Sequence, residues 1–198
     1  MNHDAYPDQY IREILGGVKS IAMVGASPVE VRPSYFAFKY LLQRGYDMVP
    51  VNPGHAGKSL LGRPFVASLA DIGRPVDMVD IFRNSSHIMP VVDEVLKLSP
   101  LPKVIWMQLG ARDDQAAAKA EEAGLKVVMN RCPKIEYGRL SSEISWMGVN
   151  SRTLSSKRAP IPSQGMRLSL NRTSVGGGAT AASDRAAKNK SDPKNDAS

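Results

Sequence analysis

The sequence predicts an α/β protein with one doubly wound parallel sheet of about five strands, and three observations support this prediction. Short apolar runs, typical of strands buried on both faces, alternate along the chain with segments of helical periodicity. The loops between these segments are short, as expected for parallel strands joined by right-handed crossovers. The chain has 198 residues, of which 42% are hydrophobic, so it can bury the core of one domain rather than two.

Each expected strand is a mainly apolar run that stops at a turn of small, polar or cationic residues. The run before Gly25 has no charge at all, and the second strand is closed by Asn52 and Pro53, whose turn chemistry exposes the backbone. We expect a loop or a short edge strand at residues 58–64 and a helical turn at 68–72. The five expected strands span residues 21–24, 46–51, 76–82, 103–107 and 125–129.

The expected helices are mostly amphipathic segments with start and stop signals of their own. Gly45 and Gly124 are natural C-terminal stops for the second and fourth helices. The fourth is rich in alanine, and the last is a helix or an irregular cap. These elements span residues 8–15, 34–45, 88–98, 113–123 and 134–146, and the expected capping residues are Ser34, Ser85 or Ser86, and Asp113.

The first strand, its loop and the following helix form the unit in which we expect the binding site. Backbone N–H groups and a helix dipole meet an anionic ligand in such a unit. Only Gly25 stands where the dinucleotide fingerprint has three glycines, and the chain has no G-K-[ST] sequence typical of a P-loop. From this motif alone, a binding loop and a simple tight strand exit remain open alternatives.

The formal net charge of +7 is concentrated toward the C-terminus. Residues 1–148 hold 17 Lys and Arg against 16 Asp and Glu, whereas residues 149–198 hold 9 against 3. Apolar periodicity ends near residue 150, and Ser, Gly, Ala, Lys and Arg dominate thereafter. We therefore expect a folded domain over residues 1–149 and a disordered basic tail over residues 150–198.

The single cysteine, Cys132, excludes an internal disulfide framework and fits a reducing cytoplasm. The N-terminal segment is polar and acidic, and the chain has no run of about 18 apolar residues. We expect a soluble cytoplasmic protein that does not enter a membrane.

Ligands of open α/β sheets bind at the carboxyl ends of the strands, where the strand order reverses. The turns at those ends in this chain are polar, small or cationic. Arg32, Lys58 and Arg83 add positive charge near the first three strand ends, which favours a phosphorylated ligand. Taken singly, each of these side chains is better explained as a solvated surface cation, and only together do they favour such a ligand.

The order of motifs along the chain carries a family resemblance. The sequences VGASPVEVRPS, GYDMVPVNP, VDMVDIFR, VIWMQLG and AGLKVVMNRCPKIEYGRL follow one another between about residues 8 and 140. In this order they resemble the small stand-alone bacterial CoA-binding proteins, which are similar to the N-terminal CoA-binding domain of the succinyl-CoA synthetase α subunit. The resemblance implies a Rossmann-like domain that holds coenzyme A.

The resemblance also implies which residues contact CoA. The first loop would lie against the pyrophosphate or pantetheine, the ends of the second and third strands would line the adenosine side, and the fourth strand end would line the pantetheine arm. A lysine would lie near the nucleotide phosphate. The implied residues, in chain order, are Gly25, Ala26, Ser27, Pro28, Arg32, Pro33, Ser34, Asn52, Pro53, Lys58, Phe82, Arg83, Gln108, Leu109 and Gly110.

We expect binding without catalysis. A synthetase α subunit has a second domain with a phosphorylated histidine, and the expected fold here ends near residue 149 without room for it. No histidine or carboxylate pair has the spacing of a metal or acid/base site, and Asp77 and Asp80 are expected on opposite faces of a strand. Cys132 is either a thiol activated by Arg131 and Lys134, able to form a mixed disulfide with CoA, or a small buried side chain, which we favour.

Two other function classes remain open at this point. One is an NAD(P)-binding protein with a redox or redox-sensing role, although the second strand ends in Asn52 and Pro53 rather than in an acid placed for a ribose hydroxyl. The other is a basic tail that binds nucleic acid or an acidic partner. We expect no nucleic-acid binding by the folded region, and an unidentified protein partner stays open.

Overall fold

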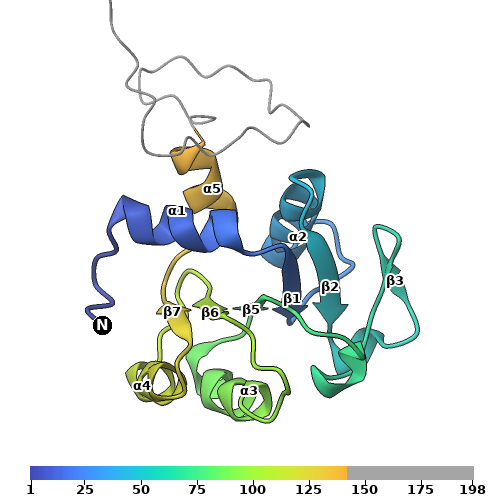
Figure 1. Cartoon of the computed structure of the whole chain (residues 1–198). Coiled ribbons are helices and arrows are strands. Elements are labelled where there is room, and N and C mark those ends of the chain that lie inside the picture. The colour runs from blue at the N-terminus through green and yellow to red at the C-terminus, as the bar shows by residue number, and fades with distance from the viewer. Residues whose placement is uncertain (142–198) are drawn as a thin grey trace, which may run out of the picture. The chain divides into compact units, whose positions relative to one another are not determined.

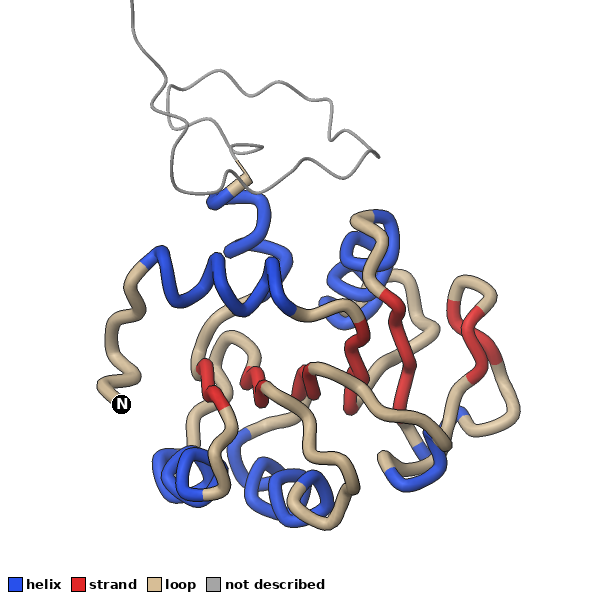
Figure 2. The backbone as a smooth tube through the Cα atoms, viewed as in Figure 1, coloured by secondary structure: helices blue, strands red, loops and turns tan. Residues whose placement is uncertain are grey.

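The computed structural model describes residues 1–141 and places five parallel strands in one sheet with the order β2-β1-β5-β6-β7 (Figures 1 and 2). The predicted basic tail at 150–198 and the end of the last expected helix lie outside the described residues. Because β1 has β2 on one side and β5 on the other, the strand order reverses between β1 and β5. The strands are β1 (Ser20–Val24), β2 (Asp47–Val51), β5 (Met78–Ile81), β6 (Val104–Met107) and β7 (Lys126–Val128).

Helices cover both faces of this sheet, as predicted. Figure 1 shows α1, α2 and α5 on one face and α3 and α4 on the other. Within residues 1–141, no helix is both long and apolar enough to cross a membrane. The helices are α1 (Asp8–Gly17), α2 (Pro33–Gln43), α3 (Ile88–Val95), α4 (Asp114–Glu122) and α5 (Pro133–Leu140), with short 3₁₀ turns at Pro53–His55, Ala70–Ile72 and Ser85–His87.

Side chains alternate across the sheet, and this alternation produces two separate hydrophobic cores. In β5, Met78 packs into the core beneath α1, α2 and α5, whereas Val79 and Ile81 pack into the core beneath α3 and α4. Every residue of β5 and β6 is buried. These strands therefore have the uninterrupted burial expected of parallel strands covered on both faces.

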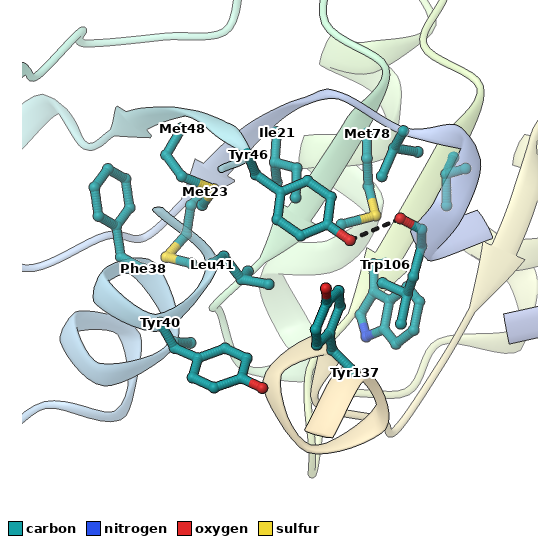
Figure 3. Packing of buried hydrophobic residues seen from close by; sticks show 14 of the residues in the cluster. Ile21, Met23, Phe38, Tyr40, Leu41, Tyr46, Met48, Met78, Trp106 and Tyr137 are labelled. Atoms are coloured by element: carbon teal, nitrogen blue, oxygen red, sulfur yellow. Dashed lines mark hydrogen bonds between the residues drawn. The ribbon is translucent and has the colours of Figure 1, made fainter. Parts of the chain in front are cut away.

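Aromatic side chains hold α5 against the sheet (Figure 3). The ring of Tyr137 lies 6.1 Å from that of Tyr46, measured between centroids, and the Tyr46 hydroxyl donates a hydrogen bond of 2.7 Å to the carbonyl of Leu15. The indole N–H of Trp106 donates to the carbonyl of Arg131 at 2.8 Å. These contacts fix the segment that leads from β7 into α5 beside the carboxyl end of β6.

Two of the predicted helix caps are wrong, and one is confirmed. Helix α2 begins at Pro33 because proline is suited to the first helical position, so Ser34 lies inside the first turn and does not cap. Neither Ser85 nor Ser86 caps α3, because both belong to a 3₁₀ turn that ends at His87. Asp113 does cap α4, and its carboxylate accepts a hydrogen bond of 3.0 Å from the N–H of Ala116.

The connection after β2 forms a small separate sheet. Strands β3 (Ser59–Leu60) and β4 (Arg63–Pro64) pair with each other antiparallel and are not part of the main sheet. This hairpin settles the expectation of a loop or short edge strand in this region in favour of paired strands. The expected helical turn at 68–72 is present as the 3₁₀ turn Ala70–Ile72.

Asp77 ties the entry of β1 to that of β5, and we expect its loss to destabilise the fold. Its carboxylate accepts hydrogen bonds from the N–H of Lys19 (2.9 Å) and the N–H and hydroxyl of Ser20 (both 3.1 Å), and it pairs with Lys103 (2.8 Å). Partial burial opposes the charge, but these hydrogen bonds outweigh burial and lower the pKa of Asp77 to about 2. The carboxylate therefore stabilises the fold above about pH 4, and this stabilisation is lost as the pH falls toward 2.

We predict that Asp77→Ala lowers the free energy of unfolding at pH 7 by about 1–3 kcal/mol, because backbone donors lose their acceptor. Lys103→Met is the matched control, since it removes only an exposed ion pair and is expected to cost less than about 1 kcal/mol. Urea unfolding followed by circular dichroism measures both. Equal losses in the two variants would contradict the role given to the backbone hydrogen bonds.

Candidate ligand-binding site

Two neighbouring cavities open at the carboxyl ends of the strands, where the strand order reverses. The cationic cavity, of about 550 Å³, is lined by residues that include Gly25, Ser27, Arg32, Asn52, His55 and Arg83. The apolar cavity, of about 620 Å³, is lined by residues that include Val31, Phe36, Leu109, Cys132, Lys134 and Ile135. Pro33, Phe82 and Arg83 line both cavities, so the two adjoin at these residues.

The loop after β1 forms the floor of the cationic cavity and requires glycine at its first position. Gly25 has a φ of +86°, and its N–H donates to the carbonyl of Val51 at 2.9 Å. A Cβ atom at this position would lie 2.3 Å from the carbonyl oxygen of Phe82. The Asn52 side chain donates to the carbonyl of Ala26 at 2.8 Å. The ends of β1, β2 and β5 are therefore held in close contact beneath the cavity.

Helix α2 directs its N-terminus into the cationic cavity between two arginines. Its N-cap is Arg32, and no side chain caps its first turn. Within residues 1–141, neither Arg32 nor Arg83 forms an ion pair with a carboxylate. Two exposed guanidinium groups and the positive end of a helix dipole make this cavity suitable for an anion such as a phosphate.

The apolar cavity lies between the first turns of α2 and α5. Phe36 and Ala37 come from α2, Ile135 comes from α5, and Gln108 and Leu109 follow β6. The ammonium group of Lys134 lies 6.0 Å from the ring centroid of Phe36. The cavity therefore offers mainly apolar contact, with polar groups at a few points.

A buried carboxyl group supports the polar side of this cavity. The Gln108 side-chain N–H₂ donates to Asp80 at 2.9 Å, and the other carboxyl oxygen of Asp80 has no hydrogen-bond partner among residues 1–141. Burial raises the pKa of Asp80 to about 8, and the hydrogen bond from Gln108 opposes this shift only partly. At neutral pH, the carboxyl group is therefore largely protonated. With its nitrogen engaged by Asp80, Gln108 has its carbonyl oxygen to offer to the cavity.

Cys132 lies in the apolar cavity at the N-cap of α5. Burial is the main cause that raises the pKa of its thiol. Asp80, once ionised, acts in the same direction, whereas hydrogen bonds from the backbone of Ile135 and Lys134 and the charge of Lys134 oppose the shift. The thiol form therefore dominates at neutral pH. Cys132 is half-buried at the cavity wall and is not a core residue, as the favoured interpretation had it, and this environment does not supply the lowered pKa that an activated thiolate needs.

The structure brings most of the sequence-predicted site residues to the two cavities. Those that line them are Gly25, Ser27, Arg32, Pro33, Ser34, Asn52, Phe82, Arg83, Gln108 and Leu109. Ala26 is buried beneath the loop, Lys58 is exposed before the β3–β4 hairpin, and the N–H of Gly110 donates to Asn130 at 2.9 Å. Among the residues described, these three and Pro28 and Pro53 line neither cavity.

Sequence reasoning missed several cavity residues. His55 lines the cationic cavity, and Val31, Phe36, Lys134 and Ile135 line the apolar one. The sequence signal for His55 was its position in the turn after the second strand. The other four lie within or just before helices, where only the packing of the helix decides which side chains reach a cavity.

The protein is a doubly wound, Rossmann-like α/β protein with a cationic cavity at the switch point of its sheet, which is where proteins of this fold class bind their ligands. Residues 19–138 match the family described as the CoA binding domain, and the protein belongs to this family. The matched region contains every residue that lines the two cavities.

Relatives of this chain agree with the family match. The Bacillus subtilis protein YneT is 35% identical over 127 residues, which is 64% of this chain and 91% of YneT. A Thermus thermophilus structure is 40% identical with a TM-score of 0.64, and the match covers 68% of this chain and 98% of that one. A Pyrococcus horikoshii structure is 42% identical with a TM-score of 0.65, covering 69% and 94%. The shared domain makes up nearly the whole length of each relative.

Proposed function

We propose that the protein binds coenzyme A or an acyl-CoA without catalysing a reaction, with the phosphates in the cationic cavity and the pantetheine arm in the apolar cavity. The observation that carries this proposal is that the two cavities adjoin and share Pro33, Phe82 and Arg83 in their linings. A ligand that fits both must have an anionic end and a long, mainly apolar arm. Coenzyme A has this distribution of charge, and the family match supports it.

The phosphates of CoA are suited to the groups around the cationic cavity. The first turn of α2 offers the N–H of Ser34 and a positive dipole end, and Arg32 and Arg83 offer charge-assisted hydrogen bonds. The small residues of the loop at Gly25 allow a close approach of the ligand to the backbone. His55 adds a polar ring at the edge of the same cavity.

The pantetheine arm is suited to the apolar cavity because it combines apolar segments with amide groups. Gln108 presents a carbonyl oxygen that can accept from an amide N–H, and its orientation is fixed by the hydrogen bond to Asp80. The surrounding apolar side chains exclude water, so a ligand amide that finds no hydrogen-bond partner there weakens binding. A hydrogen bond from the amide to Gln108 therefore favours ligands that carry an amide at this position. In this proposal Gln108 recognises the pantetheine arm, and Arg32 and Arg83 bind the phosphates.

The geometry does not favour the NAD(P) alternative. Among residues 1–141, no carboxylate lines the cationic cavity, where a dinucleotide site places an acid against the ribose hydroxyls. Asn52, at the end of β2, uses its side chain to bind the carbonyl of Ala26 and the N–H of Gly54. That side chain holds the loop rather than a ribose.

Calorimetric titration of the full chain with CoA tests this function. Arg83→Ala and Arg32→Ala are each expected to weaken CoA binding roughly 10- to 100-fold, the range set by one charge-assisted hydrogen bond. Arg63→Ala is the matched control, because Arg63 pairs with Asp47 at the start of β2 and lines neither cavity. Absence of CoA binding, or binding of NAD in its place, would overturn the proposal.

Ligand protection of the single thiol provides a further prediction. Because Cys132 lines the apolar cavity and its thiol has a raised pKa, we expect slow alkylation by iodoacetamide at pH 7 compared with the unfolded chain. Saturating CoA should slow the reaction a further tenfold or more by covering the sulfur. Mass spectrometry gives the rate without ambiguity, since the chain has one cysteine. A rate unchanged by CoA would show that the arm does not reach this cavity.

A further inference from the structure

Large apolar side chains are exposed around the mouth of the apolar cavity, and folding alone does not explain them. Four of the exposed large hydrophobic side chains line this cavity, with exposed fractions of 81% for Val31, 51% for Phe36, 56% for Leu109 and 46% for Ile135. We call this group the apolar rim. Scattered exposed apolar residues are normal on a protein surface, but a group gathered at one cavity marks a contact surface.

The rim is assembled from four separate parts of the chain. Val31 precedes α2, Phe36 lies within α2, Leu109 follows β6, and Ile135 lies in the first turn of α5. Helix α2 buries Ala37, Phe38 and Leu41 in or near the core, so Phe36 projects from the remaining side of the helix. The fold thus brings together apolar side chains that contribute little to either core.

The rim continues the surface on which the pantetheine arm would lie. Phe82 and Arg83 line both the cationic and the apolar cavity, whereas Lys134 and Ile135 of α5 line the apolar cavity and not the cationic one. An arm that enters beside Arg83 therefore directs its sulfur end toward the rim. Any group attached to that sulfur contacts the rim next.

Resting on the proposed binding of CoA, we propose that the preferred ligand is a CoA thioester with a neutral, apolar acyl chain that covers the apolar rim. The side chains of the apolar rim support a neutral chain, because they offer no hydrogen bond to a carboxylate that would be desolvated against them. Two cationic side chains line this cavity, Arg83 at the boundary with the cationic cavity and Lys134 on α5. The ammonium group of Lys134 lies 6.0 Å from the ring centroid of Phe36 and 5.9 Å from that of Tyr40. At these distances the rings stabilise the ammonium group only weakly and its charge remains, so a charged acyl chain is the direct competitor against which the neutral chain is tested.

Titration of the full chain with free CoA, butyryl-CoA, octanoyl-CoA and succinyl-CoA tests this inference. Each methylene that reaches the rim is expected to tighten binding by up to roughly fourfold. Octanoyl-CoA should therefore bind at least tenfold more tightly than butyryl-CoA. Succinyl-CoA, which is as long as butyryl-CoA but charged, should bind no more tightly than free CoA.

Two rim variants locate the effect. Val31→Ser and Ile135→Ser change exposed side chains, and each should reduce the ratio of the free-CoA dissociation constant to the octanoyl-CoA dissociation constant severalfold, in addition to any loss of affinity that both ligands share. Leu101→Ser is the matched control, because Leu101 is also exposed but lines neither cavity. It should leave both affinities unchanged.

The outcomes separate this inference from the function on which it rests. If none of the four compounds binds, the proposed function fails. If CoA binds but chain length has no effect, or succinyl-CoA binds most tightly, the function stands and the apolar acyl chain is overturned. The acyl-chain inference is also overturned if light scattering shows that Ile135→Ser dissociates a dimer while the dependence of affinity on chain length stays the same. The rim would then be an interface with a second copy of this chain.

Discussion

Gly25→Ala is expected to abolish measurable CoA binding and to lower the free energy of unfolding by about 2–5 kcal/mol. The positive φ that the loop requires costs a residue with a Cβ about 1–2 kcal/mol of conformational free energy. The new Cβ would also lie 2.3 Å from the carbonyl oxygen of Phe82, which is backbone and cannot rotate away. The loop must then separate from the end of β5, at a cost of about 1–3 kcal/mol for overpacking. That movement would displace both the loop and Arg83, whose Nε lies 3.2 Å from the added atom.

Gly124→Ala is a control that separates the two causes of destabilisation in Gly25→Ala, which are the clash of the new Cβ with Phe82 and the positive φ. Gly124 has the same φ of +86°, and a Cβ there would have no heavy atom within 4 Å. We expect this control to lose only the conformational part of the stability, about 1–2 kcal/mol, and to bind CoA like the unchanged protein. Chemical unfolding and calorimetry of both variants measure the difference. Equal stability losses, or intact CoA binding by Gly25→Ala, would contradict the close packing of the loop on Phe82.

The fold could be predicted from the sequence because its signals are local and repeated. The apolar runs that end at Gly25 and Asn52 are too short for helices, and the segments between strands carry helical periodicity. All five predicted strands form, although most are shorter by a residue or two at an end. Helix starts were harder to predict, because Pro33 and the 3₁₀ turn at Ser85–His87 compete with the nearby serines for the first turn.

The candidate site was predictable only where it follows the strand ends. Gly25 and Asn52 immediately follow strands and Arg83 is the second residue after β5, so the rule for open α/β sheets locates them without further information. Phe36 and Ile135 reach the apolar cavity because of how α2 and α5 rotate and pack on the sheet, which no local pattern specifies. Lys58 lies on a connection whose path depends on the β3–β4 hairpin, and it lines neither cavity.

The protonation state of Asp80 could not be predicted from the sequence either. It is an acid in an otherwise apolar run, and the sequence pattern assigned it to the face opposite Asp77 without predicting its environment. In the structure it lies in the middle of β5, fully buried, between Met23 of β1 and Trp106 of β6. Burial and the single hydrogen bond from Gln108 determine its protonation, and both depend on the assembled sheet.

Asp80→Asn is expected to remove a large pH dependence from the stability of the protein. The pKa of Asp80 is about 3.8 in an unfolded chain and is raised to about 8 by burial in the folded one. Between these values the folded state retains a proton that the unfolded state has released. Stability from this group is therefore complete below about pH 4 and declines as the pH rises to 8, by up to roughly 1.4 kcal/mol per pH unit.

Asparagine preserves the shape of the side chain and the oxygen that accepts from Gln108, but it cannot ionise. Subtracting the unfolding free energies of Asp80→Asn from those of the unchanged protein between pH 5 and pH 9 isolates Asp80, because every other titrating group is common to both. The difference should shift in favour of the variant by several kcal/mol across this range, while CoA affinity at pH 7 stays within about twofold. A difference that does not change with pH would mean that Asp80 ionises freely in the folded protein, which would require water to reach it beneath the apolar cavity.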